Sequence, residues 1–403
     1  MTATETSPTL INSALAHRFE AERLMVIIPD RLSALVTKGE VTERYYNPGE
    51  LFREVHIVAT NDDRPDLAVL QRAVGRAKLV LHSLPTGSRY FLRTAGWQWP
   101  LIEPFIKRGV ALARRIRPQL VRTHNNFLEG ALAGRIKQEL GIPFVVSLHG
   151  VWDIDDRKTA IARLRAGFRA KLERAALTAA DAVIAVYHPI ERYARAFGAK
   201  RVELIYNIVA GAEIARKTSY ALGRPPRLVT INRQLPEKNP ENIIRAVAGL
   251  DCTYTLIGDG PLHEPLRALA QNLGCADRVE FIKAMPNSRL CSELGGYDAM
   301  VSHCDYWGMS KTIIEGGLAG LPIVINRHPE IEIAEYAGGW IVECENSPEG
   351  YRDAIERILR DEGHRRALGT LAHEVAITRF DPGRMEQRTV ALYRDVQDKA
   401  ARV

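Results

Sequence analysis

The chain has 403 residues, of which 46% are apolar and 26% are charged; this length predicts two domains of roughly 150 to 200 residues rather than one core. No apolar run reaches the ~18 residues that cross a bilayer, and residues 1–17 lack the apolar segment of a secretory signal, so we expect a cytoplasmic protein. The formal net charge of +7 favours anionic partners, without choosing among nucleotides, nucleic acid and lipid.

Short apolar runs rich in β-branched residues alternate with helical patterns in the first half of the chain. Strands are expected at residues 24–28, 55–59, 79–81, 120–123, 144–148, 182–186 and 202–205. Strands separated by helical segments are typical of βαβ units, which build a parallel sheet with helices on both faces.

A second series of the same kind follows, with strands expected at residues 228–231, 254–257, 279–282, 299–302, 322–325 and 340–342. The fold class is therefore α/β, with two Rossmann-like, doubly wound parallel sheets. We place the first domain at residues 1–210, a Gly- and Pro-containing linker at 211–226, the second domain at 227–382 and a closing helix that packs back across the hinge at 383–403. Ligands of such sheets lie outside the carboxyl ends of the strands, which predicts a cleft between the domains.

The cysteines are odd in number and widely spaced, and all of them lie in the second half without any CxxC pair. This pattern argues against structural zinc and redox motifs and favours free, mostly buried thiols. Nothing in the sequence requires a metal or another cofactor.

Two cations follow the first strand of the second domain. Arg233 comes directly after this strand, and Lys238 follows across a turn that contains a proline. A guanidinium and an ammonium at the mouth of a strand-turn-helix unit can bind two phosphates. The alternative is a pair of solvated loop cations. Gly258 ends the next strand, where a glycine lets backbone approach a ligand.

A second anion site is expected where a helix begins near residue 311. The residues at this helix start that we expect to bind the phosphates of a nucleotide-sugar donor are Gly308, Met309, Ser310, Lys311 and Thr312. Free backbone N–H groups and the helix dipole favour phosphate there. Glu315 lies one turn further on, where a carboxylate can accept hydrogen bonds from ribose hydroxyls. The alternative for Glu315 is a solvent-facing helix residue.

Three weaker assignments lie in the first domain. His149 ends a strand and is followed by a glycine, so we expect it to face the cleft and contact a sugar hydroxyl or the leaving group, although a lone histidine is more often structural. Asn125 and Asn126 end the preceding predicted strand and are candidates for the acceptor sugar. Gly39 belongs to a loop that we expect over the acceptor.

Basic residues crowd the helical stretch at residues 157–174 against the single acid Glu173. A solvated helix face is the common explanation, and peripheral contact with an anionic membrane is the alternative. Nucleic acid is not expected, because no helix-turn-helix signal, zinc spacing or aromatic-basic interleaving is present.

Together these motifs resemble the group-1 (family 4) retaining nucleotide-sugar glycosyltransferases, which have the two-Rossmann-domain GT-B fold. The resemblance rests on Arg233 with Lys238, on Gly-Asp-Gly-Pro from Gly258 and on Glu-x-x-x-x-Gly-x-Pro from Glu315. It implies that the two cations bind the donor diphosphate, that Glu315 binds the ribose and that His149 lies at the reaction centre. It also implies front-side transfer, in which the leaving phosphate helps to deprotonate the acceptor.

The family usually has a second glutamate eight positions before Glu315, and this chain has Trp307 there. That carboxylate normally contacts the transferred sugar. Asp305, two residues away, is a substitute if the loop is reshaped, and Trp307 is an alternative that would stack on a sugar face.

The predicted function is transfer of a sugar from a nucleoside-diphosphate sugar to a glycan or a lipid-linked glycan, as in polysaccharide biosynthesis, by a protein on the inner membrane face or free in the cytoplasm. Two alternatives stay open: a catalytically inactive GT-B scaffold that binds nucleotide, and a nucleotide-sugar epimerase.

Overall fold

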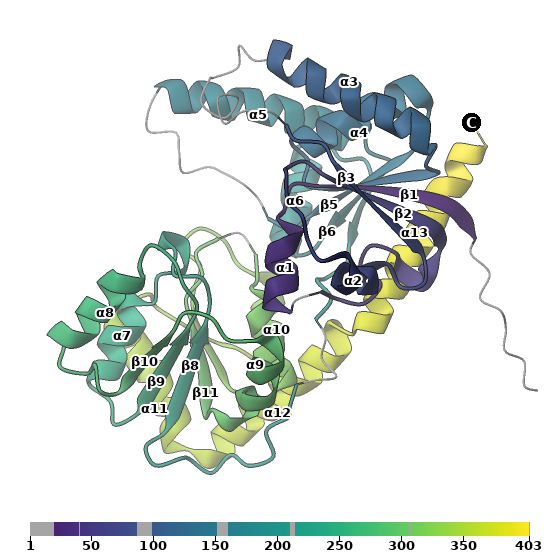
Figure 1. The fold of residues 1–403 in the computed structure, drawn as a ribbon. Coiled ribbons are helices and arrows are strands. Elements are labelled where there is room, and N and C mark those ends of the chain that lie inside the picture. The colour runs from purple at the N-terminus through teal and green to yellow at the C-terminus, as the bar shows by residue number, and fades with distance from the viewer. Residues whose placement is uncertain are drawn as a thin grey trace, which may run out of the picture.

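The computed structural model describes residues 20–39, 41–86, 99–150, 160–209, 214–306 and 308–402. These residues form two parallel β-sheets, one of 7 strands and one of 6, which lie in separate domains (Figure 1). The predicted fold class is therefore confirmed.

The first sheet has the strand order β3-β2-β1-β4-β5-β6-β7. Its strands are β1 (Ala21–Ile28), β2 (Phe52–Ala59), β3 (Lys78–Ser83), β4 (Leu120–His124), β5 (Phe144–Leu148), β6 (Ala182–Ala185) and β7 (Val202–Leu204). Residues 24–28 of β1 are at most 1% exposed, because a central parallel strand is covered on both faces.

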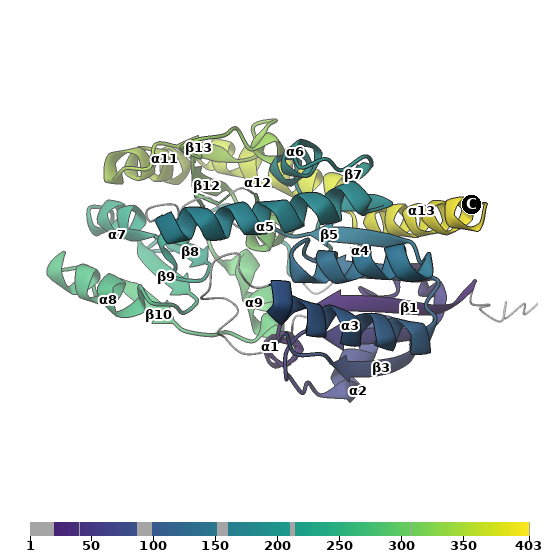
Figure 2. The same cartoon turned by 90° about the horizontal axis from the view of Figure 1, so that it is seen from above.

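Helices connect these strands and cover the sheet. They are α1 (Leu32–Lys38), α2 (Leu67–Leu70), α3 (Trp99–Ile116), α4 (Leu128–Leu140), α5 (Ala160–Ala179) and α6 (His188–Ala196). Figures 1 and 2 show α3, α4 and α5 side by side over one face. Gly39 ends α1 with φ of 70°, a left-handed conformation that glycine adopts without steric cost. The candidate acceptor loop thus begins with a helix-terminating glycine.

The second sheet has the order β10-β9-β8-β11-β12-β13. Its strands are β8 (Arg227–Ile231), β9 (Thr253–Ile257), β10 (Val279–Ile282), β11 (Ala299–Ser302), β12 (Ile323–Asn326) and β13 (Val342–Cys344). Its helices are α7 (Glu241–Ala248), α8 (His263–Asn272), α9 (Asn287–Glu293), α10 (Lys311–Leu318), α11 (Pro348–Arg360) and α12 (Glu362–Arg379).

The last strand differs from the prediction, which began it at Trp340. Trp340 instead precedes β13 and is fully buried, with its indole N–H donating to the carbonyl of Glu335 at 2.9 Å. Its ring contacts Phe380 at a centroid distance of 6.1 Å. An aromatic residue with high strand propensity therefore fills the core beside the sheet, because tertiary packing outweighs propensity.

The final helix, α13 (Pro382–Ala401), leaves the second domain and runs along the first (Figure 1). Tyr393 packs on Phe52 with ring centroids 6.4 Å apart, and Arg394 binds Glu20 through both Nε and Nη2. Consequently the end of the chain is anchored on the domain where the chain begins.

Candidate active site

The strand order reverses between β1 and β4 in the first sheet and between β8 and β11 in the second. Such reversal points open a crevice at the carboxyl ends of the strands. β4 leads into Asn125 at this edge and β5 into His149, whereas β8 leads into Arg233. The topology therefore gathers candidates from both halves of the chain at these two edges.

The two edges approach each other. The backbone N–H and the ring Nδ1 of His188, after β6, lie 2.8 Å and 2.7 Å from Glu335 Oε1, after β12. A Cβ atom on Gly308, after β11, would lie 3.0 Å from the ring of Tyr187. The glycine thus permits close packing of the second domain against the first.

His149 lies in a network of neutral groups from the first domain. Its Nδ1 is 3.1 Å from Asn207 Oδ1, and its Nε2 is 3.2 Å from the Tyr45 hydroxyl and 3.1 Å from the Ser147 hydroxyl. Because the Asn207 amide nitrogen donates to Tyr187, its oxygen faces His149 and accepts the proton of Nδ1. Nε2 then accepts from the two hydroxyls, and this pattern assigns the tautomer.

The imidazole of His149 is neutral at physiological pH. His149 keeps exposed surface, yet many protein atoms surround its ring. This desolvation, together with the charges of Arg122 and Lys311, lowers the pKa of His149 to about 3. The ring stacks on His124 at 5.2 Å with an interplanar angle of 7°, and burial also holds the pKa of His124 well below its usual range.

Lys311, at the start of α10 in the second domain, contributes to the low pKa of both histidines of the first domain. The structure thereby brings His149 together with the predicted anion site of the second domain. Both nitrogens of His149 already have partners, so a sugar must displace a hydroxyl from Nε2 or contact the open side of the ring.

The two asparagines lie differently. Asn126 is 3% exposed and its amide faces the Tyr193 hydroxyl at 3.4 Å, which leaves it inside the domain rather than at the surface that an acceptor reaches. Asn125 is partly exposed and has φ of 107°, an uncommon conformation for a residue other than glycine. The structure therefore favours Asn125 over Asn126 as the acceptor contact.

The buried side-chain amide of Gln234 stabilises the loop that carries Arg233. Gln234 is fully buried; its Nε2 donates to the carbonyl of Gly258 at 2.7 Å, and its Oε1 lies 3.0 Å from His263 Nδ1. A Cβ on Gly258 would lie 1.9 Å from the carbonyl oxygen of Asn232. Gly258 is thus required for the contact between two loops, and this contact supports the exposed Arg233.

Lys238 ends the short helix η4 (Pro236–Lys238). Its Nζ lies 4.8 Å from the ring centroid of Tyr306, a cation–π distance, and burial lowers the pKa of its ammonium. Arg233 is exposed, whereas Lys238 is partly enclosed. The Lys238 side chain is therefore more restricted than the Arg233 side chain, although both residues follow β8.

Helix α10 begins after Ser310, which has extended backbone angles and makes no side-chain cap. The Thr312 hydroxyl donates to the Ser310 hydroxyl at 2.9 Å. Met309 is 1% exposed, so its side chain belongs to the core and only its backbone can reach a donor. Lys311 is exposed and Glu315 is partly exposed one turn on, as the predicted donor site requires.

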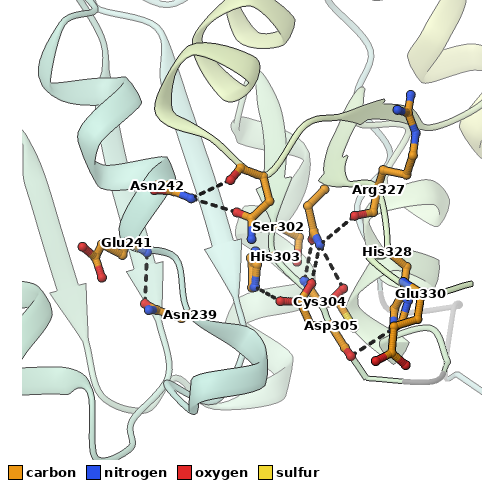
Figure 3. Close-up of polar contacts among 12 residues, drawn as sticks. Asn239, Glu241, Asn242, Ser302, His303, Cys304, Asp305, Arg327, His328 and Glu330 are labelled. Carbon is orange, nitrogen blue, oxygen red and sulfur yellow. Dashed lines mark hydrogen bonds and ion pairs between the residues drawn. The ribbon is translucent and has the colours of Figure 1, made fainter.

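Asp305 has partners within the second domain (Figure 3). Its carboxylate lies 3.0 Å from His303 Nε2 and accepts from the Asn326 amide at 2.6 Å. Despite partial burial, these contacts and the neighbouring His328 lower the pKa of Asp305. The acid is thus ionised and oriented by its own domain. Trp307 lies outside the described residues.

Among the described residues, no group of three or more His, Cys, Asp or Glu side chains is arranged to hold a metal ion. In the same ranges no helix is long and apolar enough to cross a membrane. All five cysteines are free and buried.

Sequence reasoning missed three residues that organise the site: Tyr45 and Arg122 beside His149, and Gln234 below Arg233. Tyr45 comes from a loop about a hundred residues before His149, and no local pattern connects the two. Gln234 directly follows Arg233, yet its burial depends on a glycine loop from the next strand.

Two family models match the chain: "Glycosyl transferases group 1" over residues 213–375 and "Glycosyltransferase Family 4" over residues 53–210. The fold and this site thus define a GT-B protein, and the chain belongs to the group-1 (family 4) glycosyltransferases. The resemblance seen in the sequence motifs is confirmed.

Among its relatives is the lipopolysaccharide core biosynthesis glycosyltransferase LpsE of Rhizobium meliloti, 27% identical over 187 residues that cover 45% of this chain and 54% of LpsE. Another is the GDP-mannose-dependent alpha-(1-6)-phosphatidylinositol monomannoside mannosyltransferase of Mycobacterium tuberculosis, 25% identical over 178 residues, 41% of this chain and 46% of that protein. The chain spans about half the length of these curated relatives.

Solved structures share the fold across nearly the whole chain. Sucrose-phosphate synthase from Thermosynechococcus elongatus superposes with a TM-score of 0.72 at 16% identity, covering 93% of this chain and 99% of that one. HepE from Anabaena, solved with UDP, gives 0.70 at 14% identity over 93% of this chain and 100% of its own. At these identities the likeness shows the fold alone.

Proposed function

We propose that the protein transfers a hexose from a nucleoside-diphosphate sugar to a saccharide acceptor with retention of configuration. The observation that carries the proposal is the placement of cations from one domain against a neutral polar network of the other. Arg233 and Lys238 follow β8, while Lys311 starts α10 close enough to affect the pKa of His149. A leaving diphosphate needs such positive charge, and an attacking hydroxyl needs neutral hydrogen-bonding groups.

The donor half would work by stabilising the charge that develops on the leaving diphosphate. Arg233 offers a planar fork of donors, Lys238 a point charge and α10 its first backbone N–H groups. Glu315 would accept hydrogen bonds from the ribose. These cations supply the charge that a divalent ion supplies in other phosphate sites, so the proposal needs no metal, and a chelator should leave turnover unchanged.

Retention follows in this proposal from front-side attack. Asp305 is the described acid that precedes the donor helix most closely in sequence, and it is held by His303 and Asn326 rather than free to form a covalent sugar adduct. His149 is neutral and its Nε2 lone pair is occupied, so the leaving phosphate is the better proton acceptor.

The acceptor is proposed to be a glycan or a lipid-linked glycan. The names of LpsE and of the mycobacterial mannosyltransferase support this class, because one concerns lipopolysaccharide core and the other a phosphatidylinositol mannoside. The basic stretch at residues 157–174 would then lie near an anionic membrane on its cytoplasmic face. Part of that stretch serves the fold, since Arg169 binds Glu173 at 2.6 Å. Arg157 and Lys158 lie outside the described residues.

Ligand-induced thermal stabilisation tests the donor half. UDP, GDP, ADP and their common sugar conjugates are added to the wild type and to the double variant Arg233→Ala, Lys238→Ala. A ligand at one hundred times its dissociation constant stabilises the folded state by about 2.7 kcal/mol, so one base should stand out. The matched control replaces Arg360 and Arg366 with alanine, because both side chains are exposed, at 78% and 62%. Arg360 ends α11, which follows the edge strand β13 of the second sheet.

The expected result is a shift with one nucleotide that the double variant loses and the control keeps. No shift with any nucleotide would contradict the proposal. Binding without sugar transfer to any saccharide acceptor would instead support a scaffold, and interconversion of donor sugars without an acceptor would support an epimerase.

A further inference from the structure

A cavity of about 420 Å³ lies between the carboxyl ends of the first-domain strands and the start of α13. Its lining includes Arg122 from β4, Ser147 and His149 from the end of β5, Arg44 from the loop before β2 and Glu386 from α13. Ligand pockets usually have volumes of about 300 to 1,000 Å³, so this cavity has room for a sugar. Because His149 lines it, the cavity adjoins the proposed reaction centre.

Arg122 is a buried cation in this cavity whose partners are all neutral. The residue is 4% exposed. Its Nη1 donates to the carbonyl of Tyr45 at 2.9 Å and its Nη2 to the Ser147 hydroxyl at 3.3 Å, while its guanidinium lies 5.0 Å from the Tyr45 ring centroid. Its Nε is buried, and the neutral phenol of Tyr393 on α13 lies beside the guanidinium. Within the described residues no carboxylate forms an ion pair with Arg122, and an uncompensated buried charge is costly.

The other charges around the cavity do not balance Arg122. Arg44 is paired with Glu386 at 3.1 Å, and Glu386 also accepts from the backbone N–H of Gly49 at 2.8 Å. Arg72 and Glu43 are both exposed at the rim, with opposite charges. His149 is neutral. The interior therefore carries one positive charge, on Arg122, that the lining leaves uncompensated.

We propose that this cavity binds an anionic group of the acceptor, a phosphate or a carboxylate on a sugar, with Arg122 as its main partner. A guanidinium offers a planar fork of donors that matches two oxygens of a phosphate or carboxylate, and here its Nη2 donates to the neutral Ser147 hydroxyl, which an anion can replace. The inference rests on the proposed function, which assigns the acceptor to the first domain. It adds that the acceptor saccharide is anionic.

Isothermal titration of the wild type with glucose 6-phosphate, glucuronate, neutral glucose and inorganic phosphate tests the proposal. We expect at least one sugar anion to bind about tenfold or more tightly than glucose, because a charge-assisted contact is lost with the neutral sugar. Comparison of glucose 6-phosphate with glucuronate distinguishes a phosphate from a carboxylate as the preferred anion. Equal affinity for glucose and both sugar anions would overturn the proposal, as would inorganic phosphate that binds as tightly as both sugar anions.

Arg122→Gln should lose the preference for the sugar anion, and Arg122→Lys should recover only part of it, since an ammonium lacks the fork. Nucleotide binding by the same variants shows whether they fold and separates the two hypotheses. A variant that binds nucleotide and retains full affinity for the sugar anion would refute the role of Arg122. If Arg122→Gln does not fold, the comparison of anionic and neutral sugars on the wild type still decides. Absence of nucleotide binding by the wild type would instead overturn the proposed function.

Discussion

The two sides of the cleft use opposite means to present polar groups. In the first domain His149, Tyr45, Ser147 and Asn207 are neutral, hydrogen-bonded to one another and enclosed on most sides. In the second domain the exposed Arg233 and the partly enclosed Lys238 follow β8 on a loop that the buried Gln234 side chain and backbone hydrogen bonds support. On the first side the polar side chains hold one another in place by hydrogen bonds. On the second side the buried contacts of the loop hold the charged residues in place.

This difference matches the chemistry proposed for each side. A diphosphate develops negative charge as it leaves, so its stabilisation by nearby cations increases as the reaction proceeds. The attacking hydroxyl itself carries no charge, and the charge of Arg122, which contacts Tyr45 and Ser147, is proposed to serve another group of the acceptor. The two sides are also coupled, because Lys311 of the second domain contributes to the low pKa of His149 in the first.

The largest effect is expected from Gly258→Ala, which removes the backbone support of the donor side. A Cβ there would lie 1.9 Å from the Asn232 carbonyl oxygen, at a residue with φ of 139°. Overpacking and backbone strain together should cost roughly 2 to 4 kcal/mol of unfolding free energy, measured by urea denaturation. Nucleotide affinity should fall as well, because Arg233 follows Asn232 directly.

Gly274→Ala is the matched control for this variant. Gly274 also has a positive φ, of 66°, but no atom lies within 4 Å of the position that its Cβ would take. Its substitution should cost only the left-handed penalty of about 1 kcal/mol. Equal destabilisation by the two variants would show that close loop packing is not the reason for the glycine at 258.

On the acceptor side, Asn207→Ala should cost about 1 to 3 kcal/mol of unfolding free energy, because it leaves His149 Nδ1 and the Tyr187 hydroxyl without partners. With His149 no longer oriented, turnover should fall about tenfold or more while the nucleotide dissociation constant stays unchanged. Asn242→Ala serves as the control, since this amide makes an exposed contact with the carbonyl of Asn346. Loss of nucleotide affinity in the Asn207 variant would contradict the division of roles between the domains.

The contrast between the two sides also explains what the sequence could predict. All thirteen strands of the two sheets were expected within a few residues, because buried parallel strands are uninterrupted apolar runs. Arg233, Lys238 and the start of α10 were found because each lies in a short motif beside its strand. Trp340 was misplaced into a strand because its burial depends on Phe380 and on a neighbouring helix.

The acceptor side was harder to predict because its network is non-local. Ser147 lies two residues before His149, but Tyr45 and Asn207 reach the same imidazole from segments 104 and 58 residues away, and no local spacing relates them. The buried charge of Arg122 was missed for the same reason, since an arginine in a predicted strand gives no sign of what lies around it. Short motifs reveal a site built from consecutive backbone better than one built from distant side chains.

Acid should weaken the first domain through its histidines. Because burial keeps the pKa of His124 and of His149 below the value of about 6.5 in an unfolded chain, the unfolded state binds protons that the folded state does not. Stability is therefore present above about pH 6.5 and falls as the pH drops below it. One fully shielded histidine accounts for about 2 kcal/mol by about pH 5.

Glu129 opposes this trend. Burial raises the pKa of Glu129 to about 7, so the folded state keeps a proton that the unfolded state releases at a lower pH. Its contribution to stability therefore grows as the pH falls through the same window. The urea midpoints measured at neutral and at mildly acidic pH should lie closer together in His149→Asn than in the wild type. In Glu129→Gln they should lie further apart than in the wild type. The opposite order of the two variants would refute this assignment of protons.

The smallest effect is expected from Tyr306→Leu on the donor side. Leucine keeps apolar bulk beneath Lys238 but removes the aromatic ring, which lies 4.8 Å from the ammonium. A cation–π contact at a partly exposed site contributes about 0.5 to 1 kcal/mol, so nucleotide affinity should fall about twofold to fivefold as Lys238 becomes less ordered. Tyr306→Phe keeps the ring and should bind nucleotide like the wild type. Identical affinities for the two variants would mean that the ring does not position Lys238, and that the loop backbone alone sets the donor side.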